Sequence, residues 1–549
     1  MSRSIGIGPV GREAFASDRL RRGLAAVGVS GLTLALVTLV VFGFGLRLSG
    51  IERVGFAEDE INKLDAVRSY ERGDISPNAE HPMLMKALMY ASVQAARIWN
   101  ARAESGISDE AALRFPNILF GALTALPIFL LTATLFDRRT ALIAAALWST
   151  GINAITYNRI AKEDTLLVFF MLFAFYFYLR AKQTSGFDPK GKRRYYSLSG
   201  ISFGLMMASK YFPHYLGLNM LYHHLFRVRE REAGEPRGKT PTLFYILVAA
   251  AFLVANPAVL LPHTWAYLSA YTSEQLLTHT GYLMGEHLYK NNVTSTPFGT
   301  PVYFYALFLA IKIPLPVLLA FLVGLFSCLR KPKHPGHGFL LLMFALWIIP
   351  YSLMGAKWLR YTLSLMPFVY MIAAVGIIAL IGWASELIKK VFAGERATQV
   401  ATAFALLIFI LLPAWTAYAA APHYALYTNA LGGGRSGYYF PHDEFYDDGL
   451  REAIRHICET APQGATILHE TPGVVRYYLE KYGRTDLNPR VLSARDVNLN
   501  EVQKPAYVIY QRGRTYFENQ EKLKEVRAKW QLVYEVSVQG LSGVEVYSF

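Results

Sequence analysis

Residues 23–60 read GLAAVGVSGLTLALVTLVVFGFGLRLSGIERVGFAEDE, a long apolar run followed closely by three consecutive acids. An apolar run of about 20 residues is long enough to cross the hydrocarbon core of a bilayer as one helix. Carboxylates near that hydrocarbon are costly, so acids at the mouth of a transmembrane helix are expected to have a function. The stretch predicts a membrane protein with a candidate catalytic cluster at Glu58, Asp59 and Glu60.

The apolar pattern recurs along the whole chain. Of its 549 residues, 53% are hydrophobic and 17% are charged, a composition too apolar for an ordinary soluble enzyme. Candidate spans lie at roughly 23–46, 112–136, 140–157, 165–180, 195–209, 211–226, 241–262, 301–328, 338–355, 361–383 and 399–421. The sequence therefore predicts a polytopic α-helical membrane protein with about eleven transmembrane helices.

Basic residues fall in every second loop between these runs. A net charge of +15 would suggest a nucleic-acid partner for a soluble protein, but alternating basic loops mark the cytoplasmic side of a membrane protein instead. This rule makes the basic N-terminus, 1–22, cytoplasmic and places loops 51–111 and 263–300 outside. An odd number of spans then puts the tail, 422–549, outside as well. The expected location is the cell membrane, with a multi-pass domain at 23–421.

The tail has the composition of a soluble domain. Helical patterns cover 447–460, 472–482 and 516–530, and strand-like runs cover 465–469, 490–493, 506–510 and a final pair near 532–549. This alternation predicts a small α/β fold that is long enough to bury its own core. We expect an autonomous extracytoplasmic α/β domain that contacts substrate and supplies no catalytic group.

The acids at the start of the first outer loop suit proton transfer. Like charges crowded at a membrane boundary raise one another's pKa, which favours a group that accepts and later releases a proton. Asp59 is the candidate base, and Glu60 is expected to tune it. Asp164, at the start of a later span, is a further candidate, although it could equally cap that helix. A solvated loop start is the alternative for the cluster.

The short outer turns carry few cations, namely Arg159, Lys162, Lys210, Lys357 and Arg360. Lysine and arginine at span ends often only reach toward the membrane interface. Cations that converge could instead hold a lipid phosphate. Both roles are open for these side chains.

Histidines gather in the outer loop 263–300, which contains His279, His287 and Tyr289. The histidine spacing matches no compact zinc pattern, and no cysteine joins it. We therefore expect this loop to contact substrate and to hold no metal.

A motif in the first outer loop points to a known family. The chain reads Asp59-Glu60, then His81-Pro82-x-Leu84-x-Lys86, then Arg114 and Gly121 in the second span. This order resembles the protein O-mannosyltransferases, whose first loop carries Asp-Glu and His-Pro-Pro-Leu-Gly-Lys. Met83 and Met85 depart from that motif, and the β-trefoil domain of eukaryotic members is missing.

Other positions are more similar to a related family. Lys210 and the turn with Lys357 and Arg360 resemble the lipid A aminoarabinose transferases. The membrane part, 20–420, is therefore identified as a member of the wider GT-C superfamily.

The resemblance implies an inverting glycosyltransferase that takes sugar from a polyprenyl-phosphate lipid on the outer face and passes it to a protein, lipid or glycan hydroxyl. It implies Asp59 as the general base, with Glu60 and Asp164 beside it. The expected donor-binding side chains are Lys210, Arg360, Lys357 and Arg159, and His81 and Lys86 are expected to fix the helix of the first loop or to touch the donor. No cofactor is required by this chemistry, and a divalent cation is optional.

Two other functions fit parts of the sequence. Charges among apolar helices also mark transport paths, so a transporter or flippase of lipid-linked sugars is one alternative. An oligosaccharyltransferase-like enzyme that moves a whole glycan to asparagine is the other, although the tail shows no acceptor-recognition motif. Clustering of the charges at one face favours the glycosyltransferase.

Overall fold

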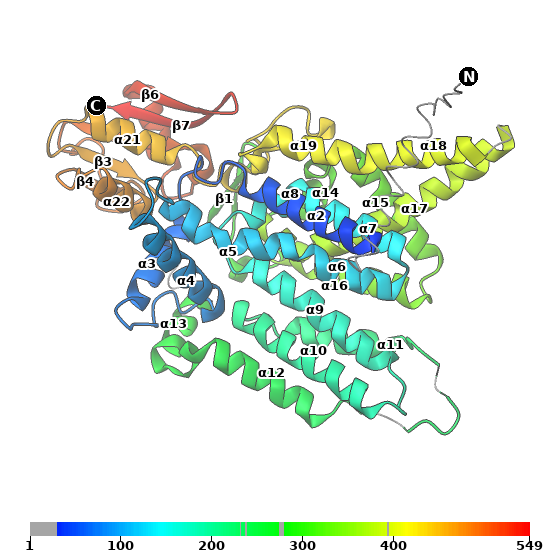
Figure 1. Ribbon diagram of the computed structural model, residues 1–549. Helices are drawn as coiled ribbons and strands as arrows, with labels where there is room; N and C mark the ends of the chain where they lie inside the picture. Colours follow the sequence, from blue (N-terminus) through cyan, green and yellow to red (C-terminus); the bar gives the residue numbers. More distant parts are fainter. Residues whose placement is uncertain (1–29, 231, 237–238, 274–278, 392–394) are drawn as a thin grey trace, which may run out of the picture.

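The computed structural model describes residues 30–549 except 231, 237–238, 274–278 and 392–394. The basic segment 1–22 therefore lies outside the described residues. Figure 1 shows a body of long helices that run side by side, with the strands of the C-terminal tail gathered at one end.

Among the described residues, helices occupy each of the apolar runs that the sequence indicated, of which the part 23–29 lies outside these residues. They are α2 (Gly31–Leu48), α5 (Asp109–Leu123), α6 (Ala125–Leu135), α7 (Arg138–Thr150), α8 (Ile152–Asn158), α9 (Asp164–Gln183), α10 (Pro189–Ser209), α11 (His214–Leu225), α12 (Thr242–Ala255), α14 (Phe304–Lys312), α15 (Leu315–Arg330), α16 (Pro335–Leu353), α17 (Met366–Val391), α18 (Glu395–Leu406) and α19 (Leu412–Ala420).

Several of these runs contain two shorter helices instead of one. Gly151 separates α7 from α8 at a point where a Cβ atom would lie 2.2 Å from the Tyr370 hydroxyl, so only glycine allows this approach. Pro314 lies between α14 and α15. Proline has no backbone N–H and its ring crowds the preceding turn, so Pro314 favours a break between α14 and α15.

Six helical segments of the described chain are long and apolar enough to cross a membrane. They are Gly31–Leu48, Asp109–Leu135, Asp164–Gln183, Pro335–Leu353, Met366–Lys390 and Thr402–Ala420. α12 and α15 are apolar but shorter. A helical chain with several candidate spans is thus confirmed, whereas the figure of about eleven spans stays a prediction, because it depends on the shorter and broken helices.

The loops 51–111 and 263–300 and the turn before α17 form short elements of their own. They contain α3 (Glu58–Tyr70), α4 (Met83–Asn100), α13 (Pro262–Thr272), the antiparallel strands β1 (Gly281–Met284) and β2 (His287–Lys290), and the 3-10 helix η3 (Leu359–Ser364).

The tail has the α/β alternation that its sequence indicated. Its helices are α20 (Pro441–Phe445), α21 (Leu450–Thr460), α22 (Pro472–Lys481), η7 (Arg512–Arg514) and α23 (Gln520–Lys529). Its strands are β3 (Thr466–His469), β4 (Asn488–Val491), β5 (Ala506–Gln511), β6 (Gln531–Val538) and β7 (Leu541–Ser548). They form one sheet in the order β4-β3-β5-β7-β6. β3 is parallel to β4 and β5, and β7 is antiparallel to β5 and β6.

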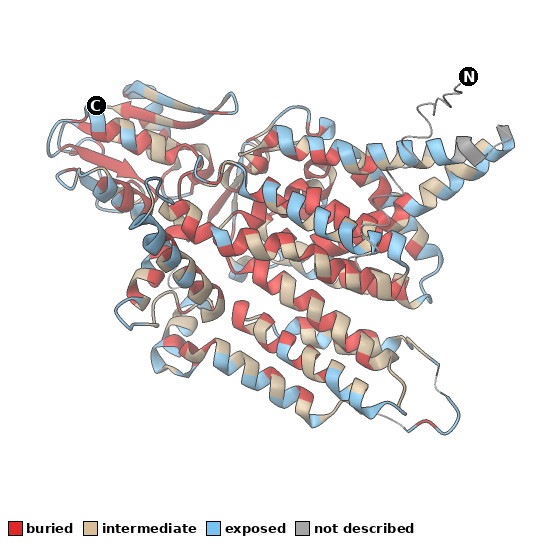
Figure 2. Ribbon diagram, viewed as in Figure 1, coloured by how far each residue is buried: buried red, intermediate tan, exposed pale blue. Residues whose placement is uncertain are grey.

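The two faces of the tail sheet belong to different cores. Leu468 and Val508 lie in a cluster made by the tail alone, whereas Ile467 belongs to a cluster that the tail shares with the first outer loop. Alternate strand residues point to opposite faces, which explains the division. Ile61 of α3 and Met89 of α4 are buried in the shared cluster. Figure 2 shows this buried region continuing from the tail strands toward α3 and α4.

The shared cluster bears on the independence of the tail. Burial of a large apolar side chain contributes about 1.5–3 kcal/mol, so the tail without the first loop would expose several such groups to water. The autonomous folding that the tail sequence indicated stays a prediction.

Candidate active site

The three acids of loop 51–111 occupy the first turn of α3. Glu58, Asp59 and Glu60 are its first three residues, where carboxylates are stabilised by the positive end of the helix dipole. Successive helical residues point about 100° apart. Each carboxylate consequently has a different set of partners.

Asp59 is held by three side chains from distant parts of the chain. Its Oδ1 lies 2.9 Å from Lys162 Nζ, in the turn before α9. Its Oδ2 lies 2.7 Å from the Arg360 guanidinium of η3 and accepts a 2.9 Å hydrogen bond from Tyr446 of the tail. The Asp59 side chain remains 29% exposed, so a substrate can reach it.

Asp59 is ionised at neutral pH. Burial raises the pKa of its carboxyl, but Arg360 and Lys162 together outweigh burial and hold that pKa well below its usual range. This corrects the expectation that crowded acids raise the pKa of Asp59. The reason is that Asp59 faces two cations, Arg360 and Lys162, which the sequence did not place beside it.

Glu60 is a buried anchor. Its carboxylate accepts two hydrogen bonds from Arg114 of α5, at 2.8 and 2.6 Å, and one from the backbone N–H of Ala161 at 2.9 Å. Only 1% of Glu60 is exposed. The residue therefore ties α3 to α5 and to the turn that carries Lys162, and it acts on Asp59 by positioning it.

A cavity of about 160 Å³ is lined by Lys162 and Arg360, the two cations that hold Asp59. Lys210 and Asp164 also line it and form an ion pair at 2.6 Å. Its other lining residues are Glu80, His81, Glu163, Tyr211, Phe212, Tyr271 and Tyr361. The structure thus brings together five candidates from the sequence, since His81 joins Asp164, Lys210, Arg360 and the adjacent Asp59.

Lys210 is enclosed in this cavity. Its ammonium lies 4.8 Å from the ring centroid of Phe212 and 5.0 Å from that of Tyr361, and 12% of its side chain is exposed. A lysine that only reached toward the membrane interface would be free of such contacts. Asp164, its partner, is the first residue of α9, whereas Glu163 takes the cap position.

A buried ion pair beside the cavity was not indicated by the sequence. Glu163 lies 2.5 Å from Lys63 of α3 and 3.7 Å from His81. Both members of the pair are only 1% exposed. Burial lowers the pKa of His81 well below its usual range, so its imidazole is neutral at neutral pH.

Three candidate cations bind backbone carbonyls instead of lining the cavity. Lys86 donates to Asn78 at 2.7 Å, Arg159 to Arg47 at 2.7 Å and Lys357 to Thr300 at 2.5 Å. Each therefore fixes a loop. For Lys86 this is one of its two expected roles, whereas the geometry gives no support to phosphate binding by Arg159 or Lys357.

The candidate residues of the outer loop 263–300 also lie away from the cavity lining. His279 stacks on Tyr516 of the tail with ring centroids 4.1 Å apart. His287 and Tyr289 lie on β2 with ring centroids 6.3 Å apart. The loop reaches the cavity through Tyr271 of α13 instead.

The tail contacts the start of α3 through Asp447 and Arg514. The backbone N–H of Glu58 donates to Asp447 at 3.0 Å, and Arg514 lies 2.6 Å from Glu58 and 2.7 Å from Asp447. Tyr446 and Asp447 both have left-handed backbone, with φ of 46° and 64°. Non-glycine residues keep this costly conformation only where their surroundings fix it. Here it sets the Tyr446 hydroxyl on Asp59.

The arrangement can bind an anion next to an ionised carboxylate. Arg360 offers a planar fork to phosphate or carboxylate oxygens, and Lys162 and Lys210 offer point charges. Among the residues that the structure describes, no three His, Cys, Asp or Glu side chains converge into a candidate metal site.

Part of the chain matches a known family. Residues 99–261 match the family model described as dolichyl-phosphate-mannose-protein mannosyltransferase. This segment includes Asp164 and Lys210 but neither Asp59 nor Arg360. No curated protein matches the sequence.

Solved structures are similar over most of the chain. ArnT from Cupriavidus metallidurans in the apo state has a TM-score of 0.50 and 14% sequence identity, and the match covers 95% of this chain and 98% of that chain. The same protein bound to undecaprenyl phosphate has a TM-score of 0.47 and 12% identity, covering 93% and 97%. The apo oligosaccharyltransferase of Archaeoglobus fulgidus has a TM-score of 0.47 and 13% identity, covering 88% and 69%. The resemblance to the mannosyltransferases drawn from the sequence is thus confirmed over residues 99–261, and the ArnT structure is similar in fold.

Proposed function

We propose that this protein is an inverting glycosyltransferase that moves a sugar from a polyprenyl-phosphate lipid to an acceptor hydroxyl. One observation carries the proposal: Lys162 and Arg360 hold Asp59 and also line the cavity that contains Lys210. Asp59 and the cavity thus share two cations. This arrangement suits a reaction in which a base takes a proton from the acceptor while a phosphate leaves the sugar.

The cavity is the proposed site of the donor phosphate. Lys162, Lys210 and Arg360 converge there with their charges already in place. Preorganised charge in a partly buried site stabilises a developing anion more than water does. A lipid-linked donor fits a site among helices of a membrane protein, because nucleotide sugars are not available on the outer face.

Asp59 is the proposed general base. Its carboxylate takes the proton of the acceptor hydroxyl as the hydroxyl oxygen attacks the anomeric carbon. The bond from that carbon to the phosphate oxygen breaks at the same time, and its electron pair leaves with the polyprenyl phosphate. Attack from the face opposite the phosphate inverts the configuration.

Donor binding is proposed to strengthen the base. Arg360 and Lys162 lower the pKa of Asp59. A phosphate in the cavity adds negative charge beside these cations and offsets their effect, so the pKa of Asp59 rises. A carboxylate with a higher pKa is a better proton acceptor. Asp59 is therefore a strong base only while the donor is bound.

The proposed topology places the site outside the cytoplasm. The alternation of basic loops supports about eleven spans with loops 51–111 and 263–300 and the tail, 422–549, on the outer side. In this arrangement the protein lies in the cell membrane, and its acceptor is a hydroxyl of a protein, a lipid or a glycan. The chemistry requires no cofactor, since three cations supply the charge, and a divalent cation is optional.

The test is turnover of a lipid-linked donor by the full chain in nanodiscs. With a panel of undecaprenyl-phosphate sugars, release of undecaprenyl phosphate should fall at least ~10²-fold in Asp59→Asn, the usual contribution of a positioned base. Asp65→Asn is the matched control, because Asp65 lies on the same helix with 56% of its side chain exposed.

Two outcomes would contradict the proposal. Normal turnover by Asp59→Asn with loss of turnover in Asp164→Asn would move the base to Asp164. Movement of intact donor between leaflets, without release of polyprenyl phosphate, would make the protein a transporter.

A further inference from the structure

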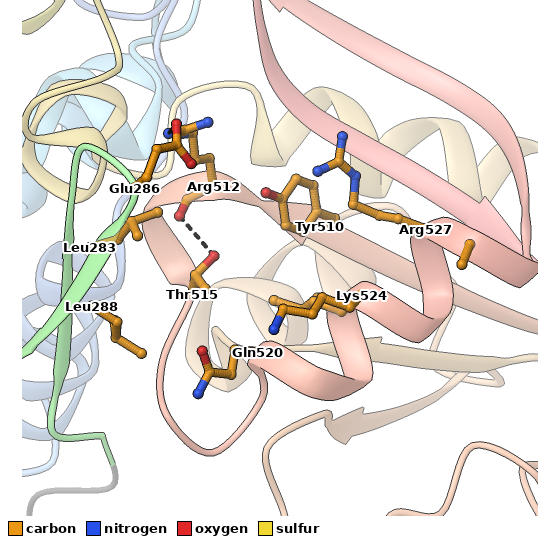
Figure 3. Close-up of a pocket in the computed structure, with 11 residues that line it drawn as sticks. Leu283, Glu286, Leu288, Tyr510, Arg512, Thr515, Gln520, Lys524 and Arg527 are labelled. Carbon is orange, nitrogen blue, oxygen red and sulfur yellow. Dashed lines mark hydrogen bonds and ion pairs between the residues drawn. The ribbon is translucent and has the colours of Figure 1, made fainter.

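A groove of about 590 Å³ lies between the β1–β2 hairpin and the tail. One wall carries Leu283 and Leu288 of the hairpin, and the other carries Tyr510, Arg512, Lys524 and Arg527 of the tail. Figure 3 shows Leu283 and Leu288 on one side of the open space and Tyr510, Lys524 and Arg527 on the other, with Arg512 beside Glu286. The groove is distinct in its lining from the cavity that contains Lys210.

The groove carries more positive than negative charge. Arg512, Lys524 and Arg527 line it together with one acid, Glu286. Lys524 is 69% exposed and Arg527 is 55% exposed, and their acidic partners Glu521 and Glu545 lie at 2.8 and 3.7 Å. Exposed ion pairs of this kind contribute about 0–1 kcal/mol. An anionic ligand can therefore compete for these cations.

The other lining groups suit a saccharide better than an extended peptide. Tyr510 offers a ring with a polar end, with Arg527 5.2 Å from its ring centroid. Thr515 and Gln520 add hydroxyl and amide groups to the lining. Sugar rings stack on aromatic faces while their hydroxyls bond to such side chains. The volume lies in the range of ligand sites, about 300–1,000 Å³.

The tail connects this groove directly to the active site. η7 contributes Arg512 to the groove, and Arg514, two residues later, contacts Glu58 and Asp447 beside Asp59. The hairpin is joined to the same segment, because Arg512 donates to the Gly285 carbonyl at 3.0 Å. A ligand in the groove would thus be held by the same short segment that positions the start of α3.

We propose that this groove binds an acidic saccharide portion of the acceptor, one that carries carboxylate or phosphate groups, at a distance from the reacting hydroxyl. The assignment rests on the proposed function and narrows its acceptor class. Binding energy from a remote part of a substrate can hold the reacting hydroxyl in place at Asp59.

The test is calorimetric titration of the full chain in detergent with three probes: trigalacturonic acid, neutral maltotriose and an acidic hexapeptide. Trigalacturonic acid should bind at least ~10-fold more tightly than the other two. Charge reversal in Lys524→Glu/Arg527→Glu should weaken its binding by ~10-fold or more. Lys529→Glu is the matched control, because Lys529 is 65% exposed on the same helix and does not line the groove.

Donor hydrolysis in the same preparations separates the possible failures. Hydrolysis by the wild type and the double variant, without saturable binding of trigalacturonic acid, would overturn the groove assignment alone. So would equal binding of all probes, preference for the peptide, or unchanged binding in the double variant. A wild type that hydrolyses no donor would instead overturn the proposed function, and the acceptor role of the groove with it.

Discussion

Asp59 shares its two cations with the neighbouring cavity. Lys162 lies 2.9 Å and Arg360 2.7 Å from its carboxylate, and both line the site proposed for the donor phosphate. A substitution of either cation therefore changes both the charge available to the phosphate and the pKa of the base. These effects are separable, because turnover and its pH dependence are measured independently.

Lys162→Met should lower turnover on the order of 10²-fold, the usual cost of one preorganised charge contact. Lys162 lowers the pKa of Asp59, so its removal raises that pKa, and Asp59 becomes protonated at a higher pH. The acidic limb of the pH profile of kcat/KM should move to higher pH. Lys162→Arg, which keeps the charge, should leave the limb near its wild-type position. If the acidic limb of the Lys162→Met profile stayed at its wild-type pH, the group that titrates there would not be Asp59.

Tyr446→Phe removes the hydroxyl group that donates a hydrogen bond to Asp59, the proposed base. The hydrogen bond fixes the orientation of the Asp59 carboxylate, so its loss should misplace the base and lower kcat about tenfold or more. Donor affinity should stay unchanged, because Tyr446 does not line the cavity. Single-turnover kinetics would measure both quantities. Tyr534→Phe, a partly exposed tyrosine of β6, is the control. A change confined to donor affinity would argue against contact with the base.

The cations of the outer turns show why sequence identifies only part of a site. Lys210 and Arg360 contact carboxylates, whereas Lys86, Arg159 and Lys357 contact backbone carbonyls. In the sequence all five are basic residues near the end of an apolar run or in an outer loop. Every residue has a backbone carbonyl, so the sequence does not show which cations bind carbonyls. It therefore could not separate the two groups.

At the level of elements, α3 is fixed by contacts on several sides. Glu60 binds Arg114 of α5, Lys63 binds Glu163 beside α9, and Glu58 binds Arg514 of the tail. These ion pairs surround Asp59, which lies between Glu58 and Glu60 in the same helical turn. The position of the base is consequently set by where α3 is held.

Glu60→Gln should lower the free energy of unfolding by about 3–5 kcal/mol, because it leaves the buried Arg114 guanidinium without its counter-charge. The measurement is the thermal midpoint in detergent. The double variant Glu60→Gln/Arg114→Met should recover part of the loss, since no uncompensated charge remains. An unchanged midpoint in Glu60→Gln would show that the ion pair is not needed for stability.

The elements themselves were largely readable from the sequence. Apolar runs and period-2 strands are local patterns, and the expected strand 506–510 matches β5 at Ala506–Gln511. Contacts between elements are not local. Asp59 and Arg360 lie 301 residues apart and both were identified, because each is a charge at an outer turn. Tyr446 lies 387 residues from Asp59 in a tail whose docking no sequence pattern reveals.

Across the whole molecule, the tail is joined to the active site by both apolar and charged contacts. It shares an apolar cluster with α3 and α4, and Tyr446 and Arg514 contact the first turn of α3. The tail sequence indicated a domain that contacts substrate and supplies no catalytic group. The contacts predict that loss of the tail lowers donor hydrolysis. Asp59 would lose its hydrogen bond from Tyr446, and α3 would lose the ion pair of Glu58 with Arg514.

Arg514→Met in the full chain tests this expectation without removing the tail. Loss of the Arg514 guanidinium frees Glu58 and Asp447 from their common cation, so the start of α3 should shift. Misplacement of a catalytic group by about 1 Å can lower a rate about 100-fold. Donor hydrolysis should therefore fall on the order of 10–100-fold. Arg490→Gln, whose partner Asp496 is 75% exposed, is the control elsewhere in the tail. Thermal midpoints of both variants would show whether they fold. A folded Arg514→Met protein with normal donor hydrolysis but poor transfer to the acceptor would restrict the tail to acceptor binding, as its sequence alone indicated.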